Sequence, residues 1–161
     1  MTATIQPAPV RRSVTVKAPP ERAFQVFTAG IDRWWPASHH IGASPLKQSI
    51  LEPAEGGRWY SICQDDSQCD IGKVLAWEPP GRLLLAWQIT AQWGYDPNLI
   101  TEIEVLFTAQ DDGTTRVDLE HRHLERMGDT ADTAYAQLSA PNGWGLILSL
   151  FAEAAGQGAK S

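Results

Sequence analysis

The C-terminal segment constrains the fold of this chain of 161 residues more than any other part. Between residues 144 and 155, apolar side chains recur at helical spacing. The stripe consists of Trp144, Ile147, Leu148, Phe151 and Ala155, and Leu146 and Leu150 widen it. A helix that is apolar over most of its circumference has to be nearly surrounded by other elements. The rest of the chain must therefore supply a curved surface around it.

A series of short predicted strands can supply that curved surface. Apolar and polar residues alternate, with the period of half-buried strands, in seven stretches. These stretches are residues 13–18, 48–52, 58–64, 71–78, 82–90, 101–107 and 114–124. Tight turns such as Asp-Asp-Gly at 111–113 separate them, and consecutive short strands joined in this way favour an antiparallel sheet.

Two short helices are predicted after the first strand. Ala23, Phe24 and Phe27 fall at helical spacing before Gly30, and a second helix over 31–35 ends at Pro36. The predicted fold is α+β: a curved antiparallel sheet of about seven strands, wrapped around a long C-terminal helix. We expect one domain over residues 10–156, with flexible tails at 1–9 and 157–161.

Charge and composition exclude several classes of function. With 19 acidic and 13 basic residues, the net charge of −6 argues against nucleic acid as a partner. Membrane insertion is not expected, since the chain contains no apolar stretch of about 20 residues. The N-terminal residues lack the pattern of an export signal, so a cytoplasmic location is expected. Cys63 and Cys69 are interpreted as free thiols, although a disulfide between them stays open.

Seven tryptophans are distributed over five of the predicted elements and one loop. Tryptophan combines a large apolar surface with one N–H donor, so it suits a cavity that is partly polar. Filling of the core is the alternative, and for any single tryptophan it is the more common one. The residues predicted to bind a ligand are Trp35, Trp59, Trp87, Trp93, Tyr95, Ile103, Val105, Leu119, His121, His123, Trp144 and Leu148.

Two loops are candidates for closing such a cavity. Residues 36–45 contain two prolines, one glycine and several small residues without periodicity. Residues 91–99 carry Trp93 and Tyr95 beside Gly94 and Pro97. Aromatic side chains on a loop tend to fold back over apolar surface. We therefore place Trp93 and Tyr95 at the cavity mouth, and a homodimer contact through the same residues is the alternative.

Several short motifs resemble one known family, in an order that covers most of the chain. They are P-E-R-A-F at 20–24, W-W-P at 34–36, G-G-R-W at 56–59, E-P-P-G-R-L-L-L-A-W at 78–87, G-T-T-R-V at 113–117 and G-W at 143–144. Together they resemble homologues of the activator of heat-shock-protein-ninety ATPase, within the START/SRPBCC helix-grip superfamily. The resemblance implies a cavity between sheet and helix that holds an apolar or amphipathic small molecule.

The best chemical clue is the sequence His121-Arg122-His123. Alternate residues of a strand face the same side, so both histidines should point into the cavity with Val117 and Leu119. Three interpretations compete. The histidines form a polar spot that binds ligand or water, they act as general acid or base, or they bind a metal. The first is favoured over the second, and the second over the third.

A metal site would need at least one further ligand. His39, His40 or Glu102 are the candidates, but adjacent histidines such as His39 and His40 normally point apart. The sequence lacks H-E-x-x-H, paired C-x-x-C and phosphate-binding glycine motifs. We therefore predict neither a metal nor a cofactor.

These observations favour a cytoplasmic small-molecule binding protein with an internal cavity and an unidentified ligand, rather than an enzyme. The first alternative is an enzyme of the polyketide cyclase or dehydratase type that uses His121 or His123 as the catalytic residue. The second is a module that regulates a chaperone in the stress response, as the resemblance implies.

Overall fold

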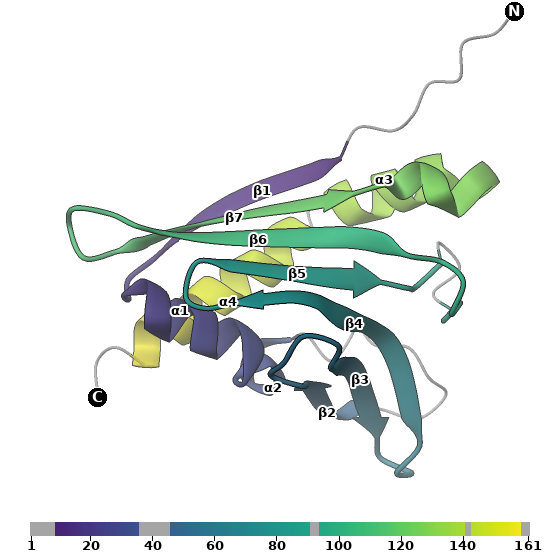
Figure 1. Cartoon of the computed structure of the whole chain (residues 1–161), viewed down its shortest axis with the longest axis horizontal. Helices are drawn as coiled ribbons and strands as arrows, with labels where there is room; N and C mark the ends of the chain where they lie inside the picture. The colour runs from purple at the N-terminus through teal and green to yellow at the C-terminus, as the bar shows by residue number, and fades with distance from the viewer. Residues whose placement is uncertain (1–8, 36–45, 91–93, 141–142, 159–161) are drawn as a thin grey trace, which may run out of the picture.

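The computed structural model describes residues 9–35, 46–90, 94–140 and 143–158, and its centre is one antiparallel sheet of seven strands (Figure 1). The order across the sheet is β1-β7-β6-β5-β4-β3-β2, so the first strand pairs with the last. The strands are β1 (Val10–Val16), β2 (Leu46–Leu51), β3 (Arg58–Cys63), β4 (Gln68–Glu78), β5 (Arg82–Trp87), β6 (Thr101–Ala109) and β7 (Thr115–Arg122). The predicted α+β helix-grip fold is confirmed.

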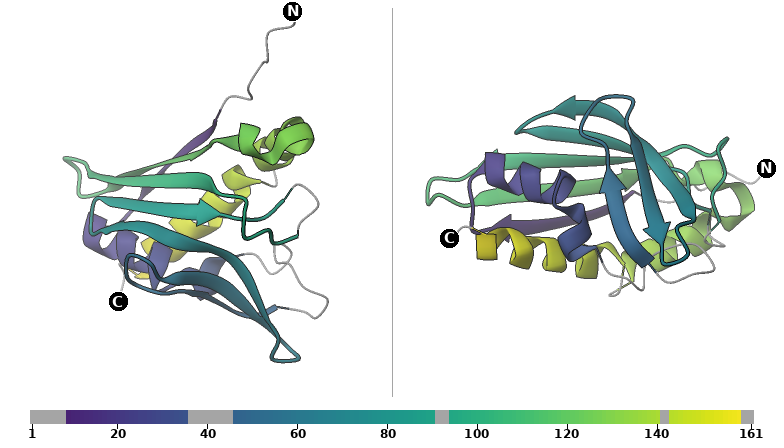
Figure 2. Two further views of the ribbon diagram at one scale, coloured as in Figure 1. Left: turned by 45° about the vertical axis from the view of Figure 1, so that its right-hand side comes forward. Right: turned by 90° about the horizontal axis from the view of Figure 1, so that it is seen from below.

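Helices occupy the concave side and one end of this sheet (Figure 2). They are α1 (Pro20–Thr28), α2 (Ile31–Trp34), the 3₁₀ helix η2 (Leu124–Thr130), α3 (Ala131–Ser139) and α4 (Trp144–Gly158). The two short helices expected after the first strand are present, and α4 continues two residues past the predicted domain boundary at 156. Among the described helices, none is both long and apolar enough to cross a lipid bilayer.

The stripe on α4 packs as its spacing predicts. All five of its main residues are buried, and Phe151 contacts Phe27 of α1 with ring centroids 5.0 Å apart. Leu146 and Leu150 are only half-buried. The helix is therefore covered along one broad stripe rather than all around, because the sheet curls over a single side of it.

One helical region was missed by the sequence analysis. The sequence pattern predicts no helix over the mostly polar residues 126–139, yet these residues include most of η2 and the whole of α3. The buried face of α3 consists of Ala131, Ala134 and Leu138, which do follow helical spacing. Two of these three residues are alanines, so the periodic signal is weak. The other side of α3 carries mostly polar or small residues.

The outer face of the sheet is covered by ion pairs. Arg122 on β7 reaches Glu102 and Glu104 on β6 at 3.1 and 3.2 Å, and Glu120 at 3.3 Å. Arg11 on β1 binds the other side of Glu120 at 2.7 Å, which helps to lower the pKa of that carboxyl. Ion pairs that remain open to solvent, as these partly are, contribute little to stability individually. Their arrangement does establish that the convex face is the solvated one.

Gly72 lies in β4 where the backbone of β5 leaves no room for a side chain. It pairs in register with Trp59 of β3 on one side and with Trp87 of β5 on the other. A β-carbon at this position would collide with the carbonyl oxygen of Ala86 and would lie 3.6 Å from the ring of Trp59. Only glycine therefore allows β4 and β5 to approach this closely between the two indoles.

We expect Gly72→Ala to lower the free energy of unfolding by about 3 kcal/mol, because the new methyl group has to displace the backbone of β5. Gly81→Ala is the matched control, since a β-carbon at Gly81 meets no atom within 4 Å. Urea denaturation of both variants beside the wild type measures the difference. Equal midpoints for the two variants would contradict the close contact at Gly72.

Candidate ligand-binding site

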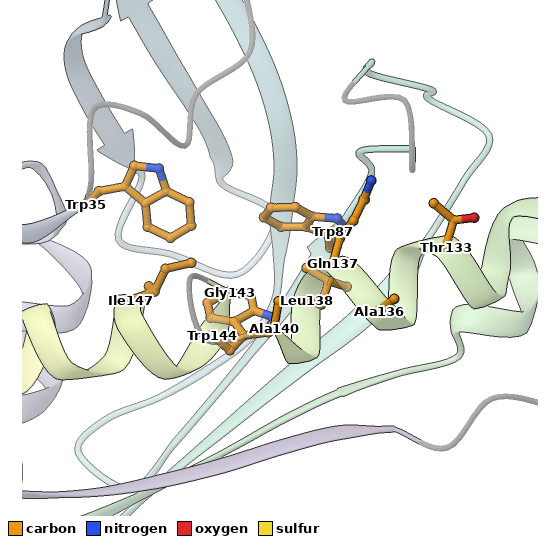
Figure 3. Close-up of a pocket in the computed structure, with 10 residues that line it drawn as sticks. All are labelled: Trp35, Trp87, Thr133, Ala136, Gln137, Leu138, Ala140, Gly143, Trp144 and Ile147. Carbon is orange, nitrogen blue, oxygen red and sulfur yellow. The ribbon is translucent and has the colours of Figure 1, made fainter.

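A pocket of about 470 Å³ opens between the end of the sheet and helices α3 and α4 (Figure 3). Three tryptophans from separate elements form its apolar side: Trp35 follows α2, Trp87 ends β5 and Trp144 begins α4. The remaining lining residues come from α3, the connection that follows it, and α4. They are Thr133, Ala136, Gln137, Leu138, Ala140, Gly143 and Ile147.

The three indoles of the pocket form a cluster with a fourth indole, in which Trp144 and Trp59 each contact both Trp35 and Trp87. Trp144 lies 6.2 Å from Trp35 and 6.0 Å from Trp87, measured between ring centroids. Trp59 lies 5.6 Å from both Trp35 and Trp87, in edge-to-face and tilted contacts. Aromatic pairs are favourable in these arrangements. Contacts among the four indoles therefore fix the positions of the three rings that form the apolar side of the pocket.

A chain of hydrogen bonds fixes two of these tryptophans. The indole N–H of Trp144 donates to Nδ1 of His121 at 3.1 Å. Nε2 of His121 and Oγ1 of Thr101 are 2.7 Å apart, and the Thr101 hydroxyl donates to the backbone carbonyl of Trp87 at 3.0 Å. The chain thus connects the start of α4 to the end of β5 through two buried polar side chains.

The geometry of this chain determines the protonation state of His121. An indole nitrogen can only donate, so Nδ1 has to be the acceptor and the proton of the neutral ring is on Nε2. Nε2 then donates to Thr101. Complete burial also disfavours the charged form and lowers the pKa of His121 to about 3. His121 is therefore a neutral imidazole whose two nitrogens are both occupied.

His121 does not reach the pocket. Its side chain is fully buried and is not part of the pocket lining. It packs against the rings of Trp87 and Trp144, which line the pocket in its place. The expected inward direction of this side chain is correct, but its contacts are with protein groups. The arrangement supports a role in positioning the two indoles rather than direct contact with a ligand.

The expectation that His123 faces the same side as His121 is wrong. Strand β7 ends at Arg122, and His123 adopts a left-handed backbone conformation with φ of 67°. Its ring lies near the outer-face carboxylates, with Nε2 3.6 Å from Glu102 and Nδ1 3.6 Å from Glu125. The alternation of a strand no longer holds once the backbone leaves the extended region.

The other residues predicted to bind a ligand fall into three groups. Trp35, Trp87 and Trp144 line the pocket. A second group is buried in the core behind it and consists of Trp59, Ile103, Val105, Leu119 and Leu148. Tyr95 pairs with Ile89 in an isolated bridge, is 40% exposed and does not line the pocket. Trp93 and the predicted closing loop 36–45 lie outside the described residues.

The lining residues on α3 were missed because α3 itself was missed. Thr133 is three residues before Ala136 and four before Gln137, which places these three residues on one side of a helix. That spacing was the available signal. Most of these side chains are small or polar, so the hydrophobic pattern did not reveal it.

The described residues contain no group of three His, Cys, Asp or Glu side chains placed to hold a metal ion. His39 and His40 lie outside them. Cys63 and Cys69 are free thiols, and burial together with the neighbouring Cys63 raises the pKa of Cys69.

The chain matches the model of the family described as activator of Hsp90 ATPase homolog 1-like protein over residues 17–156. It belongs to this family. Among curated proteins, none matches the chain. The family assignment agrees with the fold, in which the sheet curls over α4.

Solved structures of this fold include two that are similar in sequence. The anthrahydroquino-gamma-pyrone synthase Txn09 is 36% identical, over 92% of this chain and 97% of that one, with a TM-score of 0.65. The self-sacrificing resistance protein CalC from Micromonospora echinospora is 29% identical over 93% and 95%, with a TM-score of 0.68. An Hsp90 activator from Plasmodium falciparum, 15% identical over 72% and 73% with a TM-score of 0.51, shares the fold.

Stability should depend on pH through His121. The native state keeps this ring neutral down to a pKa of about 3, whereas the unfolded chain takes up a proton below about 6.5. The free energy of unfolding should therefore fall by about 2 kcal/mol between pH 7 and pH 5. His121→Gln removes this titration, so its pH dependence in the same interval should be nearly flat. Urea denaturation at both pH values is the measurement, and equal slopes for the two proteins would contradict the neutral, buried histidine.

Proposed function

We propose that this protein binds a flat, mostly apolar small molecule in the pocket between the sheet, α3 and α4. The observation that carries the proposal is the set of three indoles, Trp35, Trp87 and Trp144, around a space of about 470 Å³. Pockets that take cofactor-sized or drug-sized molecules have volumes of roughly 300–1,000 Å³ and mainly apolar and aromatic linings with a few polar groups. Here Thr133 and Gln137 supply the polar groups.

The similarity to Txn09 supports a fused-ring aromatic as the ligand. That protein is described as an anthrahydroquino-gamma-pyrone synthase, and it is 36% identical to this chain over nearly all of both chains. A fused aromatic ring system presents flat apolar faces, which suit contact with indole rings. We take fused aromatic ketones and phenols as the class of ligand.

Ring closure on such a molecule is the second candidate function, because the similar protein is a synthase. In forming a gamma-pyrone, a phenol oxygen adds to the distant carbonyl of a 1,3-diketone and one molecule of water leaves. His121 is an unfavourable general base for this step, since it is enclosed and both of its nitrogens are occupied. Catalysis would then depend on the pocket holding the substrate in its reactive conformation.

Regulation of a chaperone receives less support than either of these. The Hsp90 activator among the solved structures is 15% identical, and similarity at that level extends to the fold alone. The family description names the same activity. Fold similarity by itself does not establish a shared function.

Filling the pocket should weaken ligand binding. Ala136→Trp places an indole into the space between α3 and the three tryptophans, and we expect the affinity for a fused-ring ligand such as xanthone to fall at least about 10-fold. Ala109→Trp is the matched control, because Ala109 is exposed at the far end of β6. Quenching of intrinsic tryptophan fluorescence measures both affinities. Binding that survives Ala136→Trp unchanged would place the ligand elsewhere.

The second candidate has its own test. We expect 1-(2-hydroxyphenyl)butane-1,3-dione to be bound by the wild type, and its conversion to 2-methylchromone and water to be followed by absorbance. A rate that rises with protein concentration and is lost in Ala136→Trp would establish ring closure. If the protein binds the diketone but does not accelerate its conversion, the proposed binding function is retained and the synthase alternative is ruled out for this substrate class.

A further inference from the structure

One polar atom of the pocket lining, the indole nitrogen of Trp87, has no hydrogen-bond partner among the described residues. Trp87 is 5% exposed and lines the pocket, and within the described residues its indole N–H donates no hydrogen bond. Two other buried indoles, by contrast, donate their N–H to an acceptor within the protein. Trp34 donates to the carbonyl of Val26 at 2.8 Å, and Trp144 donates to His121. The indole nitrogen of Trp87 is not among the fully enclosed polar atoms, so a molecule bound in the pocket can reach this donor.

The direction of this N–H can be followed in the close-up. The nitrogen of Trp87 is at the edge of the ring that faces α3, on the side where Gln137 and Thr133 lie (Figure 3). The backbone of Trp87 is held by the hydroxyl of Thr101, and its ring packs against Trp59 and Trp144. The donor is therefore fixed in place by the surrounding protein.

Trp59 provides a contrast within the same cluster. Its N–H also lacks a partner among the described residues, but the atom is completely enclosed and Trp59 is not part of the lining. Of these two N–H groups, only that of Trp87 belongs to a residue that lines the pocket.

We propose that the indole N–H of Trp87 binds a ring carbonyl oxygen of the ligand. This inference rests on the proposed binding function, and it makes the ligand class narrower. The aromatic rings occupy the apolar side formed by the three indoles, and the carbonyl points toward α3. A site with a fixed donor that faces the ligand discriminates against a ligand that lacks the matching acceptor, because that ligand covers the donor and leaves it unpaired. The preferred ligands are thus fused-ring ketones rather than aromatic hydrocarbons of the same shape.

The test compares 9-fluorenone with fluorene, two flat molecules of nearly the same size of which only the first has a carbonyl. Trp87→Phe removes the N–H and keeps an aromatic ring. We expect the ratio of the two affinities, fluorenone over fluorene, to fall about 3- to 10-fold in this variant, the effect of one hydrogen bond. Taking the ratio cancels the loss of ring area, which weakens both ligands. The control Trp77→Phe removes an indole outside the pocket and should leave the ratio unchanged.

Infrared spectroscopy of fluorenone bound to the wild type gives a second measurement that does not depend on the variant folding. Its carbonyl stretch should lie at lower wavenumber than in hexane, as expected for a hydrogen-bonded carbonyl. An unshifted stretch, or an unchanged affinity ratio in a folded Trp87→Phe that binds both molecules, would overturn the role of Trp87 and leave the binding function intact. Failure of the wild type to bind either molecule would overturn the proposed binding function itself.

Discussion

The hydrogen-bond chain through His121 is the interaction on which the site depends. It joins Trp144, at the start of α4, to the backbone of Trp87, at the end of β5, through His121 and Thr101. Each buried hydrogen bond contributes only about 1 kcal/mol, but loss of one partner leaves a desolvated donor or acceptor whose cost is larger. The relative position of the helix and the sheet at the pocket is therefore strongly determined.

The same chain assigns His121 to structure rather than to proton transfer. A catalytic base needs a free nitrogen within reach of a substrate and a pKa near the working pH. His121 has neither, because both ring nitrogens are bonded and burial lowers its pKa to about 3. The chemistry of this pocket is that of indole faces, with a few polar groups toward α3. The proposed ligand would therefore be selected by its shape and by single hydrogen bonds.

The close approach of β4 and β5 contributes to the same cluster. Gly72 lies in register between Trp59 and Trp87, and its missing side chain allows the backbone of β4 to approach Ala86. The two indoles then meet at a centroid distance of 5.6 Å across the intervening strand. A glycine in the middle of a strand usually weakens it, but close approach of another backbone is one of the situations that require it.

The sequence by itself determined the framework of this protein. The alternation in seven stretches and the apolar stripe over residues 144–155 are local patterns, and they predicted the sheet and α4 correctly. Trp35, Trp87 and Trp144 were also identified as pocket residues, because large aromatic side chains are conspicuous in any sequence. The bounds of some strands differed by a few residues, since strand ends depend on tertiary pairing.

Only the tertiary structure decided the rest. Helix α3 carries a weak apolar pattern, so its lining residues became visible only where it packs at the end of the sheet. His121 and His123 are two residues apart and looked equivalent, but a left-handed backbone turned His123 to the outer face. The neutral state of His121 depends on Trp144 and Thr101, which are 23 and 20 residues away along the chain. Periodicity records the local direction of a side chain, whereas hydrogen-bond partners and burial depend on segments that meet only after folding.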